Sequence, residues 1–397
     1  MPERILVVDD EPDLELLILH KFRKRISQGE FEFRFAHNGQ EAMCVLSKEP
    51  SIELIVTDIN MPVMDGLTLL DRISGLPRLT KTIIVSAYDD LENIRIAMNR
   101  GAYDFLTKPI DFADLETTID KTLHEIEELR QGLVARAQLA NLEYELELAT
   151  KIQRSILPEI IRGHPEFEIG ATMLPAHQVS GDFYDFFLID GNHLGLAIGD
   201  VSGKGIPAAL FMAVSRTLLR ATALHGSSPR ECLEHVNRVL LKQSDGEVFL
   251  TLLYGILDLR TGDFQFSMGG QPPPFLCSPA ERGHFVREPR GMMLGLLEEA
   301  VYGSATIRVQ PGGTLVMYTD GVTEAEDGKG AFFTEERLQQ LLECTKHRPA
   351  GEVAAGIVDA LNVFSNAQEK TDDITILAVR FRPDPEAAPA EQAPVSS

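Results

Sequence analysis

The sequence predicts a multidomain protein in which a doubly wound parallel α/β unit is joined by a helical coiled-coil linker to a mixed α+β unit. Short apolar runs alternate with amphipathic segments up to about residue 122, a long helical pattern follows, and the chain after Pro158 becomes rich in strands. A chain of 397 residues also exceeds one ordinary domain. The predicted units are residues 1–122, 123–157 and 158–382, followed by a disordered tail at 383–397 that is rich in Pro, Ala and Glu.

Composition and charge argue against nucleic-acid-binding, secreted and membrane proteins. Acidic residues outnumber basic ones 60 to 37, and the resulting net charge of -23 repels a phosphate backbone, so we expect no nucleic-acid partner. The four cysteines are scattered without metal-ligand spacing, as is typical of reduced thiols. The first strand begins too early to leave room for a signal peptide, and no apolar stretch reaches membrane-spanning length. We therefore expect a cytoplasmic protein without membrane association.

The first unit contains five strand-like segments, which are separated by helical patterns: RILVVDD, EFRFA, ELIVTD, TIIVSA and YDFLTKP. This alternation predicts a parallel sheet that is covered by helices. Doubly wound sheets place their sites at the carboxyl ends of the strands. Polar residues fall at these ends, namely Asp9, Asp10, Asp58, Ser86 and Lys108.

These strand-end residues fit the chemistry of aspartate phosphorylation. The three carboxylates can hold a hard divalent cation such as Mg²⁺ through oxygen. Lys108 can neutralise the charge of a phosphoryl group while the Asp58 carboxylate attacks it, and Ser86 can hydrogen-bond the phosphoryl oxygens. Each residue alone also fits a helix cap or a loop, but their grouping favours a phosphorylation site.

Residues 4–122 resemble the receiver domain family of response regulators through VVDDEPD at 7–13, DINMPVMDG at 58–66, SAYDD at 86–90 and GAYDFLTKP at 101–109. The resemblance implies a flavodoxin-like fold and a cognate sensor histidine kinase as partner. It also implies Asp58 as the phosphoacceptor, and Mg²⁺ held by Asp10, Asp58 and the Asn60 carbonyl with Asp9 assisting. Ser86 is then the switch hydroxyl, Phe105 the switch aromatic residue and Lys108 the phosphate contact.

The linker carries apolar residues at spacings of three and four, interrupted once between Leu133 and Leu139, at positions 115, 119, 123, 126, 129, 133, 139, 142, 146, 149, 152 and 156. This pattern predicts that two copies of the helix pair in a coiled coil and form a homodimer. Residues 123–155 contain no proline, and Gly132 is the one helix breaker. The alternative is a helix that packs on its own domain.

The C-terminal half has mixed elements that predict a largely antiparallel α+β domain, with a hairpin at residues 260–263. Strands are expected near 166–173, 182–189, 193–199, 249–258, 263–268, 300–309, 314–319 and 373–381. Helices are expected near 205–225, 229–243, 334–344 and 350–366.

Four segments of this half place aspartates at strand ends or in tight turns, namely SGDFYD at 180–185, GDVSGKG at 199–205, YTDGVTEA at 318–325 and TDDIT at 371–375. Grouped carboxylates can hold two divalent cations, which deprotonate a shared water and direct the hydroxide at phosphorus. Any one segment also fits an ordinary turn, but four together favour metal-assisted phosphoester hydrolysis. Lys204 fits either a phosphate contact or a solvated side chain.

From about Leu146 to Phe381 the chain resembles the PP2C (PPM) family of metal-dependent protein serine/threonine phosphatases, in particular its bacterial SpoIIE- and RsbU-like branch. The resemblance rests on ELATKIQRSILP, GDVSGKGIPAAL, SMGGQPPPFL, MLGLL, YTDGVTEA and DDIT. It implies an αββα sandwich and two Mn²⁺ or Mg²⁺ ions. The implied catalytic and metal-site groups are Asp182, Asp200, Asp320, Asp372 and the Val201 carbonyl, with Asp185 and Asp373 as secondary candidates. Gln271 departs from the histidine that this branch often carries.

Together the two resemblances imply a two-component response regulator of a stress-response pathway. Phosphorylation of its receiver controls a phosphatase that acts on a phosphorylated STAS-type anti-sigma-factor antagonist. The alternative is a non-catalytic, RssB-like adaptor that binds a component of a sigma-factor pathway through a degenerate PP2C fold. Such an adaptor is expected to lose its metal carboxylates, whereas this chain keeps all four. The sequence leaves open whether phosphorylation activates or inhibits.

Overall fold

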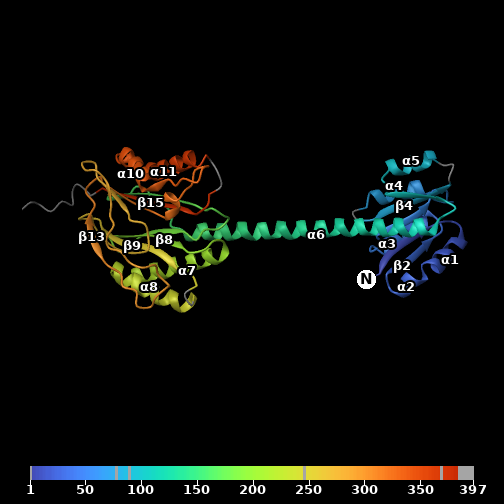
Figure 1. The fold of residues 1–397 in the computed structure, drawn as a ribbon, viewed down its shortest axis with the longest axis horizontal. Helices are drawn as coiled ribbons and strands as arrows, with labels where there is room; N and C mark the ends of the chain where they lie inside the picture. The colour runs from blue at the N-terminus through green and yellow to red at the C-terminus, as the bar shows by residue number, and fades with distance from the viewer. Residues whose placement is uncertain (1, 77–78, 88–90, 245–246, 367–369, 383–397) are drawn as a thin grey trace, which may run out of the picture. The chain divides into compact units, whose positions relative to one another are not determined.

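The computed structural model describes residues 2–76, 79–87, 91–244, 247–366 and 370–382. The chain divides into two compact units, Met1–Leu142 and Glu143–Ser397, which are coloured from blue to green and from green to red in Figure 1. The predicted disordered tail at 383–397 lies outside the described residues. Among the described helices, none has both the length and the apolar character needed to cross a membrane.

The N-terminal unit is the predicted parallel sheet, with strand order β2-β1-β3-β4-β5. Its strands are β1 (Glu3–Val8), β2 (Phe31–Ala36), β3 (Leu54–Asp58), β4 (Lys81–Ala87) and β5 (Asp104–Lys108). Its helices are α1 (Pro12–Lys21), α2 (Arg23–Ser27), α3 (Gly39–Lys48), α4 (Gly66–Ser74), α5 (Leu91–Asn99) and the first turns of α6 (Phe112–Ile156). This arrangement confirms the flavodoxin-like expectation.

Strand β1 explains why the sheet is covered on both sides. Ile5 and Val7 pack against α1 and α6 on one face, while Leu6 and Val8 pack against α3 and α4 on the other. Successive side chains of a strand point to opposite faces, so a strand that is apolar at every position has to be buried on both. The carboxyl ends of β1 and β3 thereby lie side by side, and they carry the candidate site.

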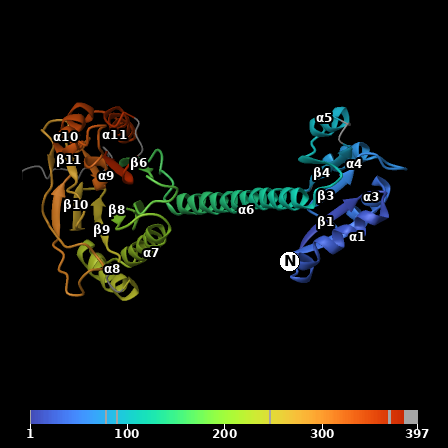
Figure 2. The ribbon, with the colours of Figure 1, turned by 45° about the vertical axis from the view of Figure 1, so that its right-hand side comes forward.

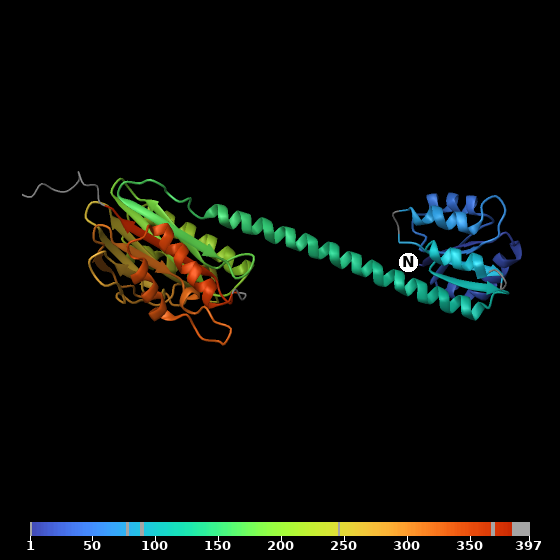
Figure 3. The same ribbon diagram turned by 90° about the horizontal axis from the view of Figure 1, so that it is seen from above.

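Helix α6 begins earlier than expected, and part of its apolar pattern serves a different purpose. Figure 3 shows α6 as an uninterrupted helix, which runs through Gly132 without a break. Leu115, Ile119, Leu123 and Ile126 belong to the core of the N-terminal unit, and Leu123 and Ile126 are only 8% and 1% exposed. The assignment of these four residues to the two-helix seam is therefore wrong, because their side chains are buried in the core of their own domain.

The C-terminal unit is a sandwich of two antiparallel sheets between two layers of helices, as Figures 1 and 2 both show. The sheet order β13-β10-β9-β8-β7 comprises β7 (Phe183–Leu188), β8 (His193–Val201), β9 (Leu250–Asp258), β10 (Asp263–Gly269) and β13 (Ala305–Arg308). The order β12-β11-β14-β15-β6 comprises β6 (Phe167–Leu174), β11 (Phe275–Cys277), β12 (His284–Phe285), β14 (Thr314–Tyr318) and β15 (Ile374–Phe381).

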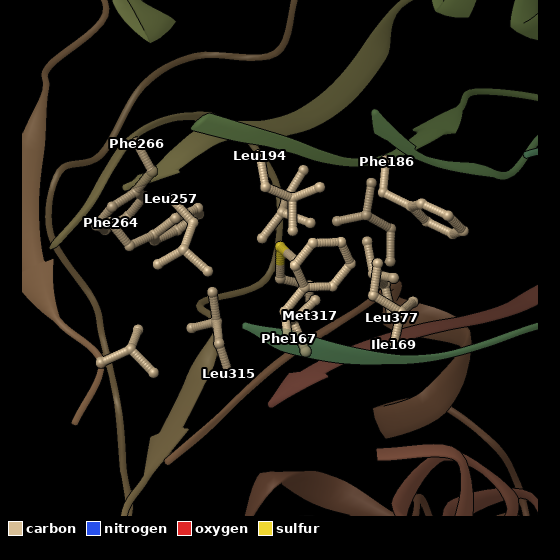
Figure 4. Close-up of a cluster of buried hydrophobic side chains, with 14 of the residues drawn as sticks. Phe167, Ile169, Phe186, Leu194, Leu257, Phe264, Phe266, Leu315, Met317 and Leu377 are labelled. Carbon is tan, nitrogen blue, oxygen red and sulfur yellow. The ribbon is translucent and has the colours of Figure 1, made fainter. Parts of the chain in front are cut away.

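Three apolar layers hold this sandwich together. The central layer lies between the two sheets, where Phe167, Leu194 and Met317 meet, as Figure 4 shows. A second layer joins β7, β8 and β9 to α7 (Ile206–Ala223) and α8 (Pro229–Ser244). A third joins β14 and β15 to α10 (Thr334–Thr345) and α11 (Ala350–Phe364). The predicted αββα sandwich is confirmed.

Most predicted elements of this unit are present, and β9 and β10 form the expected hairpin, which turns at Gly262 with a φ of 79°. The strand expected at 300–309 is shorter, since pairing with β10 involves only residues 305–308. The short strands β11 and β12 and the single-turn helix α9 (Asp320–Thr323) were not predicted. Elements of two to four residues carry no periodicity by which a sequence can identify them.

Candidate functional site

Three carboxylates meet at the carboxyl edge of the N-terminal sheet. Asp9 and Asp10 follow β1, and Asp58 is the last residue of the neighbouring strand β3. One carboxylate oxygen from each lies within 4.8 Å of the others. Asp9 and Asp58 are buried, while Asp10 is exposed. An all-oxygen set that is open on one side fits the preference of Mg²⁺ for carboxylates and water.

Lys108 supplies a positive charge to this cluster from the end of β5. Its Nζ lies 2.7 Å from Oδ2 of Asp58 and 3.0 Å from Oδ2 of Asp9. Burial lowers the pKa of Lys108, but the hydrogen bonds to Asp58 and Asp9 outweigh burial, and the pKa is raised overall. The ammonium group therefore stays charged beside Asp58, where an incoming phosphoryl group would need it.

The remaining predicted residues of this site lie on β4, on β5 and directly after β3. Ser86 is buried at the end of β4, whose Val85 pairs with Asp58. Phe105 on β5 is 40% exposed, and the Asn60 amide nitrogen lies 3.4 Å from Oδ1 of Asp58. Gly66 packs so closely that a Cβ there would lie 2.1 Å from the Asp58 carbonyl oxygen. Only glycine permits this approach.

In the C-terminal unit the four predicted aspartates come from four separate segments. Asp182 immediately precedes β7, Asp200 lies near the end of β8, Asp320 opens α9, and Asp372 precedes β15. The ends of neighbouring strands in the two sheets bring these four aspartates together. Asp182 is buried, and the other three are partly exposed.

The electrostatics of these carboxylates show that they form one cluster. Burial and then the charge of Asp320 raise the pKa of Asp200 to about 7, and Asp372 contributes in the same direction. Burial and the neighbouring Asp200 raise the pKa of Asp182, while burial and Asp372 raise that of Asp320. Such crowding of like charges disfavours the ionised forms unless cations are present.

Two glycines allow the segments to approach. A Cβ at Gly181 would lie 2.8 Å from the Val201 carbonyl oxygen and 3.7 Å from Oδ1 of Asp200. A Cβ at Gly321 would lie 2.0 Å from the Asp373 carbonyl oxygen. The first contact places the predicted carbonyl ligand beside the Asp182 and Asp200 segments, and the second joins the Asp320 and Asp372 segments.

The donor set fits divalent cations that prefer oxygen ligands. The cluster offers four carboxylates and a backbone carbonyl, with no His or Cys among the predicted ligands. Within the part of the chain that the structure describes, only Asp9, Asp10 and Asp58 gather three acidic ligands within 4.8 Å of one another. The wider spread of the second cluster suits two ions, which in such sites lie roughly 3.5–4 Å apart.

Thr319 positions Asp182, a role that the sequence did not indicate. Its Oγ1 donates a hydrogen bond of 2.8 Å to Oδ2 of Asp182 and accepts one of 3.0 Å from the Thr375 amide. Both threonines are buried. Threonine is common in strands, so its presence in a β-rich segment did not indicate a special role. Only the three-dimensional structure shows that Thr319 holds the Asp182 side chain.

Asp373 organises the loop that leads to Asp182. Its Oδ1 accepts a hydrogen bond of 2.7 Å from the Ala176 amide, and its Oδ2 accepts bonds from Ser180 Oγ at 2.7 Å and the Gly181 amide at 2.8 Å. Ser180 Oγ in turn accepts a hydrogen bond of 3.0 Å from the Asp182 amide. Asp373, predicted as a secondary metal candidate, thus anchors the backbone of this loop.

The same loop is held by the last turns of α6. The Gln153 amide group donates to the Ser180 carbonyl at 2.7 Å and accepts from the Ser180 amide at 3.0 Å. Thr150 Oγ1 donates to the Gln178 carbonyl at 2.7 Å. The end of the linker helix is therefore bonded to the segment that carries Asp182.

Asp185 requires a correction, because it pairs with arginines instead of joining the acidic cluster. Its Oδ1 accepts hydrogen bonds from Arg216 Nη2 at 3.0 Å and Arg220 Nη1 at 3.3 Å, both on α7. Burial raises its pKa, and the two arginines act in the opposite direction. Two cations already compensate this buried carboxylate, so its position fits an anchor of α7 to β7 better than a metal ligand.

Gln271 joins the two sheets. Its side chain is only 7% exposed; Oε1 accepts a hydrogen bond of 2.6 Å from Thr251 Oγ1, and Nε2 donates one of 3.0 Å to the Tyr318 carbonyl. Thr251 on β9 pairs with Asp200, and Tyr318 lies two residues before Asp320. The residue that departs from the usual histidine thus bridges β9, which pairs with the Asp200 strand, and β14, which leads into Asp320.

Comparisons with known proteins agree with both halves of this geometry. Residues 5–120 match the family model of the response regulator receiver domain, and residues 190–382 match that of stage II sporulation protein E (SpoIIE). Sporulation initiation phosphotransferase F of Bacillus subtilis is 32% identical over 123 residues, which cover 31% of this chain and 95% of that protein.

The C-terminal half is similar to phosphoserine phosphatase RsbU of Bacillus subtilis. The two are 30% identical over 239 residues, which cover 60% of this chain and 70% of RsbU. Across the first curated relatives of this half, the chain spans between 41% and 70% of their length.

A solved structure of the RsbU and RsbW domains of Rv1364c from Mycobacterium tuberculosis matches with a TM-score of 0.51 at 28% identity, covering 58% of this chain and 63% of that one. The family model, the curated relative and the solved structure agree on the C-terminal half. The chain therefore belongs to the PP2C family of serine/threonine phosphatases, in the branch of SpoIIE and RsbU, and carries a response-regulator receiver domain at its N-terminal end.

Proposed function

We propose that the protein is a response regulator whose phosphatase domain hydrolyses phosphoserine or phosphothreonine in a STAS-type anti-sigma-factor antagonist in the cytoplasm. The observation that carries this proposal is the convergence of Asp182, Asp200, Asp320 and Asp372, where burial and then mutual repulsion raise the pKa of three of the four carboxyl groups. Buried like charges of this kind are costly and are typical of sites that bind cations. A non-catalytic adaptor would not need them.

The proposed reaction is the attack of a water oxygen on phosphorus. The new P–O bond forms as the ester bond to the serine oxygen breaks, and that oxygen takes up a proton. Bound Mn²⁺ or Mg²⁺ supplies the charge neutralisation and the acidity of the attacking water. The four aspartates and the Val201 carbonyl hold the ions, Thr319 fixes the orientation of Asp182, and Asp373 fixes the loop before it.

In the receiver, we propose Asp58 as the phosphoacceptor for a sensor histidine kinase. Asp9, Asp10, Asp58 and the Asn60 carbonyl would hold Mg²⁺, and Lys108 already lies 2.7 Å from the carboxylate that would attack. Ser86 and Phe105, on the adjacent strands β4 and β5, would respond to the phosphoryl group. For the phosphatase domain, the similarity to RsbU, which is named a phosphoserine phosphatase, supports phosphoserine as the substrate.

The proposed activity should depend completely on divalent cations. The full chain, incubated with a phosphorylated STAS protein or with p-nitrophenyl phosphate, is expected to release phosphate in Mn²⁺ or Mg²⁺, and EDTA should abolish release because the carboxylates alone cannot activate water. Phosphate release is measured by a colorimetric assay, and restoration by excess Mn²⁺ is the control. Full turnover in EDTA would refute the metal assignment.

We also propose that α6 transmits the state of the receiver through paired linker helices. Beyond Ile126 the helix leaves apolar side chains uncovered, among them Leu133 and Leu142, which are 52% and 50% exposed. The last turns of the same helix bond to Ser180 through Gln153. A change in helix pairing would therefore reach the Asp182 loop, which provides an element that both sites can bias.

Replacing Leu142 with Asp, or Leu133 with Asp, should raise the dissociation constant of the dimer by at least about 100-fold, because each adds a charge to an apolar seam. Light scattering measures association, and phosphatase assays with and without beryllofluoride measure control by the receiver. Ala140→Asp is the matched control, since it adds the same charge to an exposed position off the seam. If the leucine variants stay dimeric and responsive, the linker is only a tether.

A further inference from the structure

Lys204 lies at the edge of the acidic cluster, on a loop whose base is held by hydrogen bonds. The loop joins β8 to α7, and Ser202 anchors it to Phe249 through bonds of 2.9 Å from its amide and 3.0 Å to its Oγ. Gly203 and Gly205, on either side of the lysine, have φ values of 93° and 77°, which favour glycine. The base of the loop is therefore held at Ser202, and Lys204 lies between two glycines whose backbone conformation few other residues adopt.

The ammonium group of Lys204 contacts the segment that precedes β15. Its Nζ donates to the Thr371 carbonyl and lies 3.6 Å from Oδ1 of Asp372. Among the described residues it is the one basic side chain within 4.0 Å of the Asp182, Asp200, Asp320 or Asp372 carboxylates. The side chain is 47% exposed, so the ion pair with Asp372 is screened by water and weak.

A phosphorylated substrate approaches this cluster with two negative charges of its own. The carboxylates repel it, so the phosphoryl oxygens need positive charge in addition to that of bound cations. When a divalent cation binds Asp372, it competes with the ammonium group for the same oxygen. A cation held by Asp372 would thus free Lys204, which lies at the partly exposed rim of the site, to bind phosphoryl oxygens.

We propose that Lys204 is a phosphate-binding catalytic residue, which pairs with Asp372 in the metal-free protein and transfers to the substrate's phosphoryl oxygens when the metal ions bind. This inference rests on the proposed phosphatase function. It predicts different effects on the binding of two ligands. Removing the ammonium group should weaken the binding of phosphate, and it should leave the binding of metal ions unchanged or tighter.

The test uses the full chain with Lys204→Gln and Lys204→Arg, and Lys242→Gln on the exposed surface of α8 as the matched control. In Lys204→Gln, the KM for p-nitrophenyl phosphate and the inhibition constant of inorganic phosphate should both rise about tenfold, as expected for one charge-assisted hydrogen bond. Lys204→Arg should recover part of this loss. Calorimetric titration should show that Lys204→Gln binds Mn²⁺ as tightly as the unaltered protein or more tightly. The receiver site is the same in both proteins, so its contribution to the titration cancels in the comparison.

An unchanged KM and phosphate inhibition in Lys204→Gln would overturn the proposal. Weaker binding of both phosphate and Mn²⁺ would also overturn it, since that result indicates a general disturbance of the loop. If the unaltered protein turned over no phosphoester, the proposed function would fail. The role of the lysine would still be decided by calorimetry, which compares the binding of inorganic phosphate to the Mn²⁺-loaded protein and to its Lys204→Gln variant.

Discussion

Asp320→Asn is expected to lower kcat/KM for a phosphoserine substrate by at least about 100-fold while the protein remains folded. Asp320 opens α9 within reach of the charges of Asp200 and Asp372, so its carboxylate is placed to share metal ions with both. Asparagine keeps the shape of the side chain and removes its charge. The loss should therefore appear in metal binding and catalysis, and not in folding.

Two measurements separate these effects. In EDTA, the unfolding temperature of Asp320→Asn should equal or exceed that of the unaltered protein, because the substitution relieves repulsion between buried carboxylates. Calorimetric titration should show weaker Mn²⁺ binding. The matched control is Asp359→Asn, which removes a charge from the exposed surface of α11. Full turnover by Asp320→Asn would show that the two-metal assignment is wrong.

The sequence predicted both folds because their signals are local. Every residue of β1 from Ile5 to Val8 is apolar, which is typical of a strand buried on two faces. The carboxylates of the acidic cluster could be predicted because each lies in a short Gly-Asp, Asp-Gly or Asp-Asp segment where the chain enters or leaves an apolar strand. These short acidic segments beside apolar strands can be recognised from the sequence alone.

The apolar pattern of α6 shows where this reasoning stops. Spacings of three and four residues identify the face of a helix that is buried, and they do not identify what buries it. Ile119 and Ile126 pack on their own domain, whereas Leu133 and Leu142 remain half exposed. One continuous pattern therefore serves two purposes, and only the folded N-terminal unit separates them.

The roles of individual polar residues were equally hidden. Asp185 and Asp372 are both aspartates in acidic motifs, but the first is compensated by Arg216 and Arg220. These arginines lie 31 and 35 residues further along the chain, and the sequence gave no signal that they pair with Asp185. Thr319 and Gln153 act through contacts with residues far along the chain. Such partners are set by tertiary structure alone.

Asp58→Ala is expected to abolish phosphorylation of the receiver by a small-molecule donor such as acetyl phosphate in the presence of Mg²⁺. The acceptor must lie next to both the metal ion and a positive charge, and Asp58 is the carboxylate 2.7 Å from Lys108 at the end of β3. Asp9 and Asp10 remain in the variant, but we assign them to the metal ion. Intact-protein mass spectrometry should detect one added phosphoryl group in the unaltered chain and none in the variant.

The same substitution tests whether the receiver controls the phosphatase. With Asp58→Ala, acetyl phosphate or beryllofluoride should no longer change the rate of phosphoserine hydrolysis, whichever direction that change takes in the unaltered protein. Asp58→Asn should behave in the same way, since an amide preserves the size of the side chain but cannot attack phosphorus. Asp114→Ala, an exposed position in the first turn of α6, is the control and should keep both phosphorylation and response. A stoichiometric phosphoryl group on Asp58→Ala would place the acceptor at another residue, and Asp9 or Asp10 would then have to be reassigned from metal ligand to acceptor.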